Sequence, residues 1–147
     1  MGHRGRCDPC RPWRHAPMTA FVDTNVLVRH LTGEPAALAR RATDFLATEP
    51  ELYLADLIVA ETVYVLESFY KAPRTQIATA MRSLVAMRSM ITVDPALLLR
   101  AIEVYDLERL DFAEAYLVAC AERTGVNAVV SFDASIDRVS TVTRLTP

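Results

Sequence analysis

Short apolar runs alternate along this chain with longer stretches in which apolar residues recur every three or four positions. Apolar runs bounded by turn residues predict buried strands, and the longer spacing predicts amphipathic helices. The expected strands are 19–23, 51–54, 90–93, 128–132 and 141–144. The expected helices are 25–31, 35–48, 56–71, 75–88, 95–107 and 111–125, with Asp56 and Thr75 as caps at the starts of two of them and Gly125 at the end of the last.

Strands that alternate with helices indicate an α/β fold, in which helices cover both faces of a mostly parallel central sheet. We expect a single three-layer α/β/α domain over residues 18–147. Residues 1–17 show no such periodicity and are predicted to be a disordered extension. Met18 directly precedes the first strand, so translation that begins there is a hypothesis.

Charge is unevenly distributed over the 147 residues, whose net charge is −2. Four arginines against one aspartate give residues 1–17 a charge of +3, which leaves −5 for the remainder. An acidic domain lacks the broad basic surface of a general nucleic-acid binder. The chain also has neither an apolar run of membrane-spanning length nor a secretory leader, so we expect a cytoplasmic protein that does not enter a membrane.

Four acids occupy positions that are unfavourable for an unpartnered carboxylate. Asp23 and Asp133 end the first and fourth expected strands, while Glu61 and Glu114 lie within apolar helical segments. If those two strands are neighbours, both aspartates face one crevice at the carboxyl edge of the sheet, where ligands of such folds bind. A buried carboxylate needs a partner, and the chain has a single lysine, Lys71. A shared divalent cation such as Mg²⁺ or Mn²⁺ is the economical interpretation, because hard cations prefer carboxylate oxygens.

Each acid also has an ordinary structural explanation. Asp23 can cap the helix that follows it, Asp133 can be a turn residue, and Asp111 with Glu114 has the spacing of a capping box. Glu61 is the hardest to explain in this way, because its neighbours at helical spacing are apolar.

Other chemistries are less consistent with the sequence. The phosphate-binding loops of nucleotide-dependent enzymes and the nucleophile elbow of serine hydrolases are absent. Cys7 and Cys10, with His3 and His15, have zinc-ligand character, but no strand or helix pattern surrounds them. An acidic divalent-metal site instead suits phosphodiester hydrolysis, in which the metal activates a water molecule.

These motifs resemble PIN-domain ribonucleases. The resemblance rests on the segment 21–28, which reads FVDTNVLV, followed in the same order by Ala60-Glu61, by 111–115 and by 130–133. It covers about residues 19–147, and the size resembles that of VapC-type toxins of bacterial toxin–antitoxin pairs.

The resemblance implies a PIN-like fold and a Mg²⁺- or Mn²⁺-dependent endoribonuclease, with products that carry 5′-phosphate and 3′-hydroxyl ends. It also implies a homodimer and inhibition by a cognate, VapB-like antitoxin. By position, the catalytic and metal-binding acids are Asp23, Glu61, Glu114 and Asp133, and the polar residues that hold them are Thr24, Asn25 and Ser131.

One position departs from the family pattern, because Glu114 stands where aspartate is usual. Asp111, one helical turn earlier, is therefore a further candidate ligand, and a binding module without turnover remains an alternative, as does a housekeeping RNA-processing nuclease. Arg29, Arg74 and Arg109 are candidates for contacts with RNA, against the simpler possibility of solvated surface. Apolar residues at helical spacing, including Ile77, Met81 and Leu84, suggest either a dimer surface or core packing.

Overall fold

The computed structural model describes residues 19–147. The expectations of an N-terminal extension over residues 1–17 and of a zinc site at Cys7 and Cys10 lie outside the described residues, as does Met18.

Six helices make up most of the described chain, close to the positions that the apolar periodicity predicts. They are α1 (Thr24–Thr32), α2 (Ala36–Thr48), α3 (Asp56–Ser68), α4 (Arg74–Ala86), α5 (Pro95–Leu107) and α6 (Phe112–Thr124). Gly33 and Gly125 end α1 and α6 with φ angles of 75° and 74°, a left-handed conformation that glycine adopts without strain. The sequence-based end of the last helix near Gly125 is therefore confirmed.

Two of the expected helix caps are wrong. The residues before α3 and α4 are Ala55 and Pro73, and neither supplies a side-chain hydrogen bond to its helix. Asp56 is the first residue of α3, and its Oδ2 accepts a 2.5 Å hydrogen bond from the hydroxyl of Tyr116 on α6. Asp56 thus ties two helices together where a cap was expected.

The strands pair in parallel, as an α/β fold requires. They are β1 (Ala20–Phe21), β2 (Leu52–Tyr53), β3 (Met90–Ile91), β4 (Ala128–Val130) and β5 (Thr143–Leu145). They form two sheets within residues 19–147, one with the order β1-β2-β3 and one made of β4 and β5. The condition that β1 and β4 are neighbours, which would bring Asp23 and Asp133 to one crevice, is therefore not met within the described chain.

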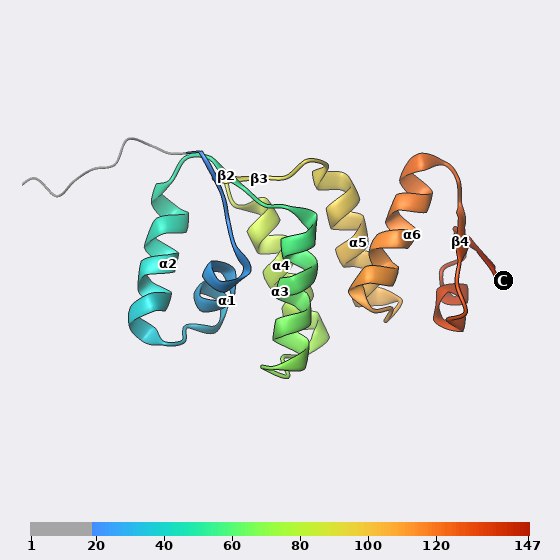
Figure 1. Cartoon of the computed structure of the whole chain (residues 1–147), viewed down its shortest axis with the longest axis horizontal. Helices are drawn as coiled ribbons and strands as arrows, with labels where there is room; N and C mark the ends of the chain where they lie inside the picture. The colour runs from blue at the N-terminus through green and yellow to red at the C-terminus, as the bar shows by residue number, and fades with distance from the viewer. Residues whose placement is uncertain (1–18) are drawn as a thin grey trace, which may run out of the picture.

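The two sheets lie in different parts of the molecule. In Figure 1, α1 and α2 lie towards one end, α3 and α4 are central, and α5 and α6 separate them from β4 at the other end. A short 3₁₀ helix that the periodicity does not predict, η1 (Ala134–Arg138), connects β4 towards β5.

One apolar core nevertheless includes buried residues from all six helices, α1 to α6. Ile77, Met81 and Leu84 on α4 belong to this core and are each about 1% exposed. Their helical spacing therefore reflects core packing, and the expectation that they form a dimer surface is wrong.

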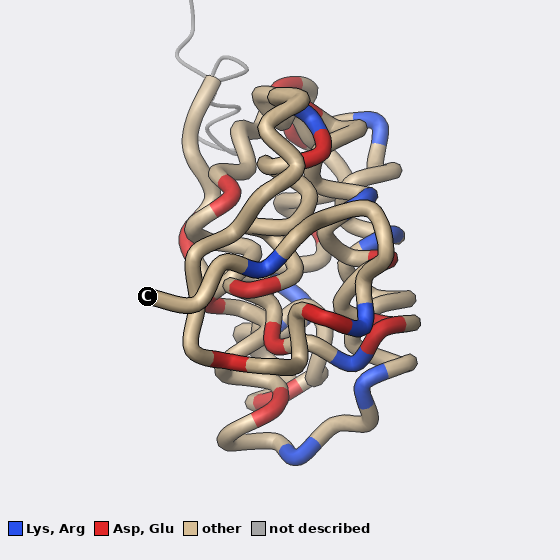
Figure 2. The backbone as a smooth tube through the Cα atoms, turned by 90° about the vertical axis from the view of Figure 1, so that its right-hand side faces the viewer, with Lys and Arg blue, Asp and Glu red and all other residues tan. Residues whose placement is uncertain are grey.

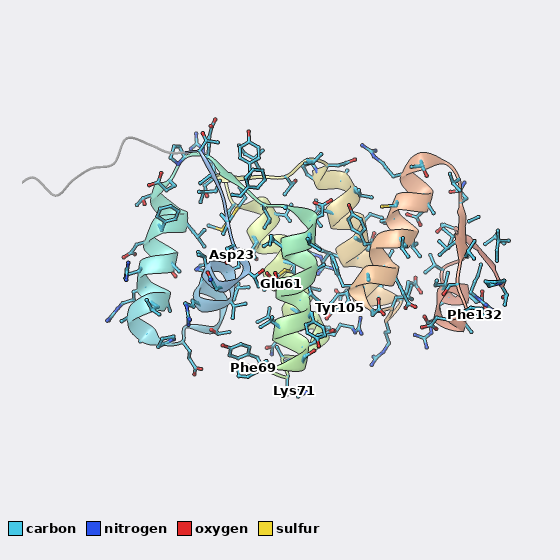
Figure 3. The ribbon with its side chains drawn as sticks, viewed as in Figure 1. Asp23, Glu61, Phe69, Lys71, Tyr105 and Phe132 are labelled. Atoms are coloured by element: carbon cyan, nitrogen blue, oxygen red, sulfur yellow. The ribbon has the colours of Figure 1, made fainter. Side chains whose placement is uncertain are left out.

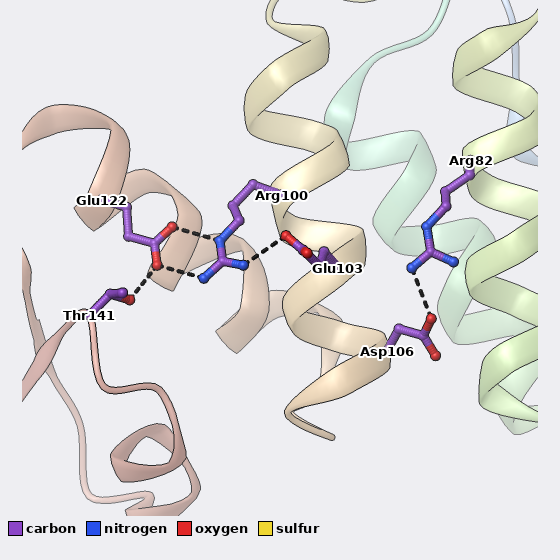
Figure 4. Close-up of polar contacts among 6 residues, drawn as sticks. All are labelled: Arg82, Arg100, Glu103, Asp106, Glu122 and Thr141. Atoms are coloured by element: carbon purple, nitrogen blue, oxygen red, sulfur yellow. Dashed lines mark hydrogen bonds and ion pairs between the residues drawn. The ribbon is translucent and has the colours of Figure 1, made fainter.

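Polar contacts reinforce the packing of α5 against its neighbours. Arg74 on α4 donates hydrogen bonds of 2.7 Å and 2.5 Å to the carbonyl oxygens of Tyr105 and Leu110, and its guanidinium carbon lies 4.2 Å from the centroid of the Tyr105 ring. Arg82 forms a 2.8 Å ion pair with Asp106 (Figure 4). These contacts fix the position of α5 relative to α4.

Arg100 joins α5 to α6. Its guanidinium binds both carboxylate oxygens of Glu122, at 2.8 Å and 3.0 Å, and also binds Glu103 (Figure 4). Thr141, in the loop before β5, donates a further hydrogen bond to Glu122. The segment that carries β4 and β5 is thereby attached to α6. No helix in the described part of the chain is long and apolar enough to span a bilayer.

Candidate functional site

Asp23 and Glu61 lie together in a pocket beyond the carboxyl end of β1 (Figure 3). Val22 is buried in the core and its backbone N–H donates to Tyr53 of β2, so the strand ends where Asp23 emerges into the open. The pocket has a volume of about 410 Å³, and Asn25 and Arg29 also line it. The prediction that Asp23 and Glu61 belong to one site is consistent with this geometry.

Thr24 links these two acids. Its side chain is buried, and its hydroxyl donates a 2.5 Å hydrogen bond to Oε2 of Glu61. The bond fixes the Glu61 carboxylate against the first turn of α1, directly after Asp23. Asp23 itself makes no side-chain capping bond to α1, so the capping explanation of this residue is not supported.

Glu114 and Asp133 form a second acidic pair, at the start of α6 and the end of β4. The hydroxyl of Ser135 donates a 3.1 Å bond to Oε2 of Glu114, and its backbone N–H donates a 2.8 Å bond to Oδ1 of Asp133. The backbone N–H of Asp133 in turn donates to the hydroxyl oxygen of Ser131 at 2.9 Å. Ser131 therefore holds the turn that presents Asp133.

The pKa values of the two acids in this pair are shifted in opposite directions. Partial burial raises the pKa of Glu114, and hydrogen bonding with the Asp133 carboxylate and the charge of Asp111 raise it further. The pKa of Asp133 is lowered, first by the backbone N–H of Ser135, then by the Ser135 hydroxyl and by Glu114. Two carboxyl groups in hydrogen-bonding contact repel each other once both are ionised, and a cation would relieve that repulsion.

Asp111 caps α6, as the capping-box spacing predicts. Its Oδ1 accepts a 2.8 Å hydrogen bond from the backbone N–H of Glu114. The Glu114 side chain does not complete a capping box, because it is directed to Ser135 and Asp133. Asp111 is exposed and close enough to Glu114 to act on it electrostatically, so it stays beside the second pair without belonging to its hydrogen bonds.

The two acidic pairs are separate within a single chain. Figure 3 shows Asp23 and Glu61 close together between α1 and α3, with Phe132, the residue before Asp133, at the far end of the molecule. Within residues 19–147, no three His, Cys, Asp or Glu side chains gather closely enough to hold a metal ion. The donor chemistry of each pair fits a hard divalent cation, but each pair supplies only two acids.

The three arginines predicted to contact RNA have different environments. Arg29 lines the Asp23 pocket, so its charge lies near the acids of that pocket. Its guanidinium also donates a long hydrogen bond of 3.4 Å to the carbonyl oxygen of Glu34. Arg74 is occupied with the carbonyl oxygens of Tyr105 and Leu110, which gives it a structural function. Arg109 is exposed and has a positive φ angle of 58° in the loop before α6.

Two residues that act on the Glu114–Asp133 pair were not predicted from the sequence. Ser135 contacts both Glu114 and Asp133, and Arg138 contributes a charge that lowers the pKa of Asp133. The Asp-x-Ser spacing at 133–135 is a signal that was available, because aspartate commonly accepts a hydrogen bond from the backbone two residues later. Figure 2 shows that basic and acidic positions are interspersed along the backbone at this end of the molecule.

A comparison with curated proteins finds no match. The family model of the PIN domain matches residues 20–142, which include both acidic pairs and every described helix. With that match over most of its length, the chain belongs to the PIN-domain family.

Proposed function

We propose that this protein is a Mg²⁺- or Mn²⁺-dependent endoribonuclease that hydrolyses phosphodiester bonds in RNA. PIN domains are generally metal-dependent nucleases that act on RNA. The observation that carries the proposal for this chain is the pair Asp23 and Glu61, held by Thr24 in an open pocket at the carboxyl end of β1. Two acids held together in a pocket are suited to a hard cation.

The acids have distinct proposed functions. Once the two separate acidic pairs are brought together, Asp23, Glu114 and Asp133 would bind the metal, with Asp111 as an alternative third ligand. Glu61 would complete the ligand shell or orient the attacking water. A divalent cation at such a site lowers the pKa of a bound water and offsets charge on the phosphate. Thr24 and Ser135 keep the carboxylates in place, while Asn25 lines the same pocket as Asp23.

RNA binding would use basic residues near the acids. Arg29 faces the Asp23 pocket, and Arg109 is exposed beside the start of α6. Both can contact phosphates, which would fix the position of RNA without reading its sequence. We leave Arg74 out of this proposed surface because its donors are satisfied within the fold.

The biological context that we propose is a VapC-type toxin of the cytoplasm, which acts as a homodimer and is neutralised by a VapB-like antitoxin. An antitoxin segment with a basic residue would fit the acidic pocket of Asp23 and Glu61, because opposite charges attract there. A short upstream reading frame that encodes a DNA-binding partner, and co-purification of that partner, would support this context over a housekeeping RNA-processing enzyme.

RNA cleavage in the presence and absence of Mg²⁺ or Mn²⁺ tests the activity. We expect cleavage that requires the metal and is abolished by a chelator and by Asp23→Asn. Asp44→Asn is the matched control, since Asp44 is exposed on α2 and away from the pocket. Cleavage that persists equally in the chelator and in Asp23→Asn would refute the assignment.

A second candidate function is a PIN-fold binding module without turnover. It is favoured by the separation of the two acidic pairs, since the described residues of one chain gather no group of three ligands. Calorimetric titration with Mn²⁺ discriminates between the two: stoichiometric binding supports the nuclease, and its absence from the folded protein supports the binding module.

A further inference from the structure

In the described part of the chain, each of the two sheets has an edge strand with one unpaired side, β1 in the first sheet and β4 in the second. Among residues 19–147, β1 pairs only with β2, and β4 pairs only with β5. All of these pairings are parallel. An unpaired strand edge presents free N–H and C=O groups and is a template for pairing with another chain.

The backbone of each strand shows which groups are available. The N–H of Val22 donates to β2, and the N–H of Ser131 donates to Leu145 at the end of β5. Successive residues of a strand direct their backbone groups to opposite sides, so Phe21 faces the open edge of β1, and Val130 and Phe132 face that of β4. Each edge therefore offers backbone donors and acceptors that match those of the other.

The side chains at these two edges are apolar and exposed. Phe21 is 75% exposed, Val130 66% and Phe132 79%. Charged residues and proline, which normally protect an edge strand, are absent from 19–22 and 128–132. The exposed rings at two unprotected strand edges provide apolar surface that a pairing strand would bury together with the free backbone groups.

The chain's own β4 is not free to cover its own β1. α5 is clamped to α4 by Arg74 and Arg82, and α6 is held to α3 by the bond between Tyr116 and Asp56. The β4–β5 sheet is in turn attached to α6 by the Ser135–Glu114 and Thr141–Glu122 bonds. These contacts hold β4 away from β1 within one chain, whereas a second copy can bring its β4 edge to β1 while they stay in place.

We propose that β1 of one protomer pairs in parallel with β4 of a second copy of this chain, so that one continuous sheet crosses the interface. Parallel pairing aligns the carboxyl ends of the two strands. Asp23 and Glu61 of one protomer then lie beside Glu114 and Asp133 of the other, and the acidic site is complete only in the dimer. The shared site rests on the proposed nuclease function, while the strand pairing does not.

The reciprocal use of both edges gives a closed dimer. Each protomer contributes one β1 edge and one β4 edge, so two copies related by a twofold axis satisfy both. This exchange explains why one chain belongs to a family of metal-dependent nucleases but holds its acids in two separate pairs.

The strand pairing is tested with two valine-to-lysine variants. Val130 and Val126 are 66% and 67% exposed, but only Val130 lies on the β4 edge, since Val126 precedes the strand. Neither substitution should alter the fold of a single chain, which circular dichroism would verify. In sedimentation velocity, the wild type and Val126→Lys should form dimers of the 16.4 kDa chain, and Val130→Lys should be monomeric. A monomeric wild type, or a dimer that survives Val130→Lys, would overturn the proposal.

The shared site is tested by complementation. Asp23→Asn and Asp133→Asn are each expected to be inactive, but a mixed dimer of the two contains one intact site and one doubly altered site. Purified through two different tags, the mixed dimer should bind Mn²⁺ and cleave RNA at about half the wild-type level. Sites formed within one chain would give no recovery, and that result would overturn the shared site.

The two tests separate the two proposals. A wild type that dimerises through Val130 and binds Mn²⁺ but leaves RNA intact would refute the nuclease function and retain the strand pairing. A wild type that cleaves RNA as a monomer would refute the strand pairing and retain the nuclease function.

Discussion

The hydroxyl of Thr24 donates a 2.5 Å hydrogen bond to Oε2 of Glu61, and this bond joins the first turn of α1 to the middle of α3. The bond connects the two elements directly through their side chains, and its donor is buried. The position of the Glu61 carboxylate therefore depends on a residue that is not itself an acid.

Thr24→Val removes this donor and keeps the shape of the side chain. We expect a loss of about 1 kcal/mol in the free energy of unfolding, because Glu61 loses one hydrogen bond but can still reach water. RNA cleavage should fall by more than this stability loss explains, since the carboxylate is no longer fixed. Urea denaturation and initial cleavage rates check the two effects. Thr24→Ser, which retains the donor, should restore both, and equal rates for Val and Ser would contradict the prediction.

Arg74→Met should destabilise the fold substantially. The change leaves the carbonyl oxygens of Tyr105 and Leu110 without their donor and removes a cation from the face of the Tyr105 ring. We expect the free energy of unfolding to fall by about 3 kcal/mol. Arg88→Met is the matched control, because Arg88 is exposed and should change stability by less than about 0.5 kcal/mol. Similar unfolding midpoints in urea for the two variants would show that Arg74 is not structural.

Glu122 makes stability depend on pH. Its hydrogen bond with Arg100 lowers its pKa from the usual value of 4.5, and the Thr141 hydroxyl lowers it further. Because the pKa is lower in the folded state, this contribution to stability is present above the unfolded-state pKa and is lost as pH falls through the folded-state pKa. Glu122→Gln should therefore be less stable than the wild type at pH 7, and the difference should shrink in more acidic solution.

Urea denaturation between about pH 7 and pH 3.5 measures this effect. Glu103→Gln serves as the comparison, because Glu103 binds the same arginine but its side chain is 49% exposed, against 20% for Glu122. An exposed ion pair contributes little, so Glu103→Gln should follow the wild-type curve closely. A pH-independent difference between Glu122→Gln and the wild type would contradict the assignment.

The sequence predicts the helices and strands well because their signals are local. The apolar spacing and Gly125 place α6 without any knowledge of its neighbours. The caps fail for the opposite reason: Asp56 is a favoured cap by residue type, but its carboxylate is occupied by Tyr116, which lies sixty residues away in sequence. Propensity does not encode such a contact.

The acidic residues are also identifiable from sequence, because Asp133 ends an apolar segment and Glu61 lies within one. Their grouping is not, since hydrophobic periodicity does not specify which strands are neighbours. The acids fall into two pairs because the strands form two sheets, with α5 and α6 packed between α3, α4 and the second sheet (Figure 1). This arrangement is tertiary and is not encoded in any local segment of the sequence.

Glu114→Asp tests whether the unusual glutamate is an adaptation of this chain. The longer side chain reaches the Ser135 hydroxyl at 3.1 Å and hydrogen-bonds with Asp133. Aspartate would withdraw the carboxylate by about 1.5 Å, the length of one carbon–carbon bond, and would lose both contacts. We therefore expect Glu114→Asp to bind Mn²⁺ more weakly and to cleave RNA more slowly than the wild type, although the resemblance to PIN-domain ribonucleases implies aspartate at this position. Glu114→Gln should lose metal binding further, and Glu34→Asp, an exposed control, should match the wild type. Tighter Mn²⁺ binding by Glu114→Asp in calorimetry would mean that glutamate weakens the site and that the reach to Ser135 has no function.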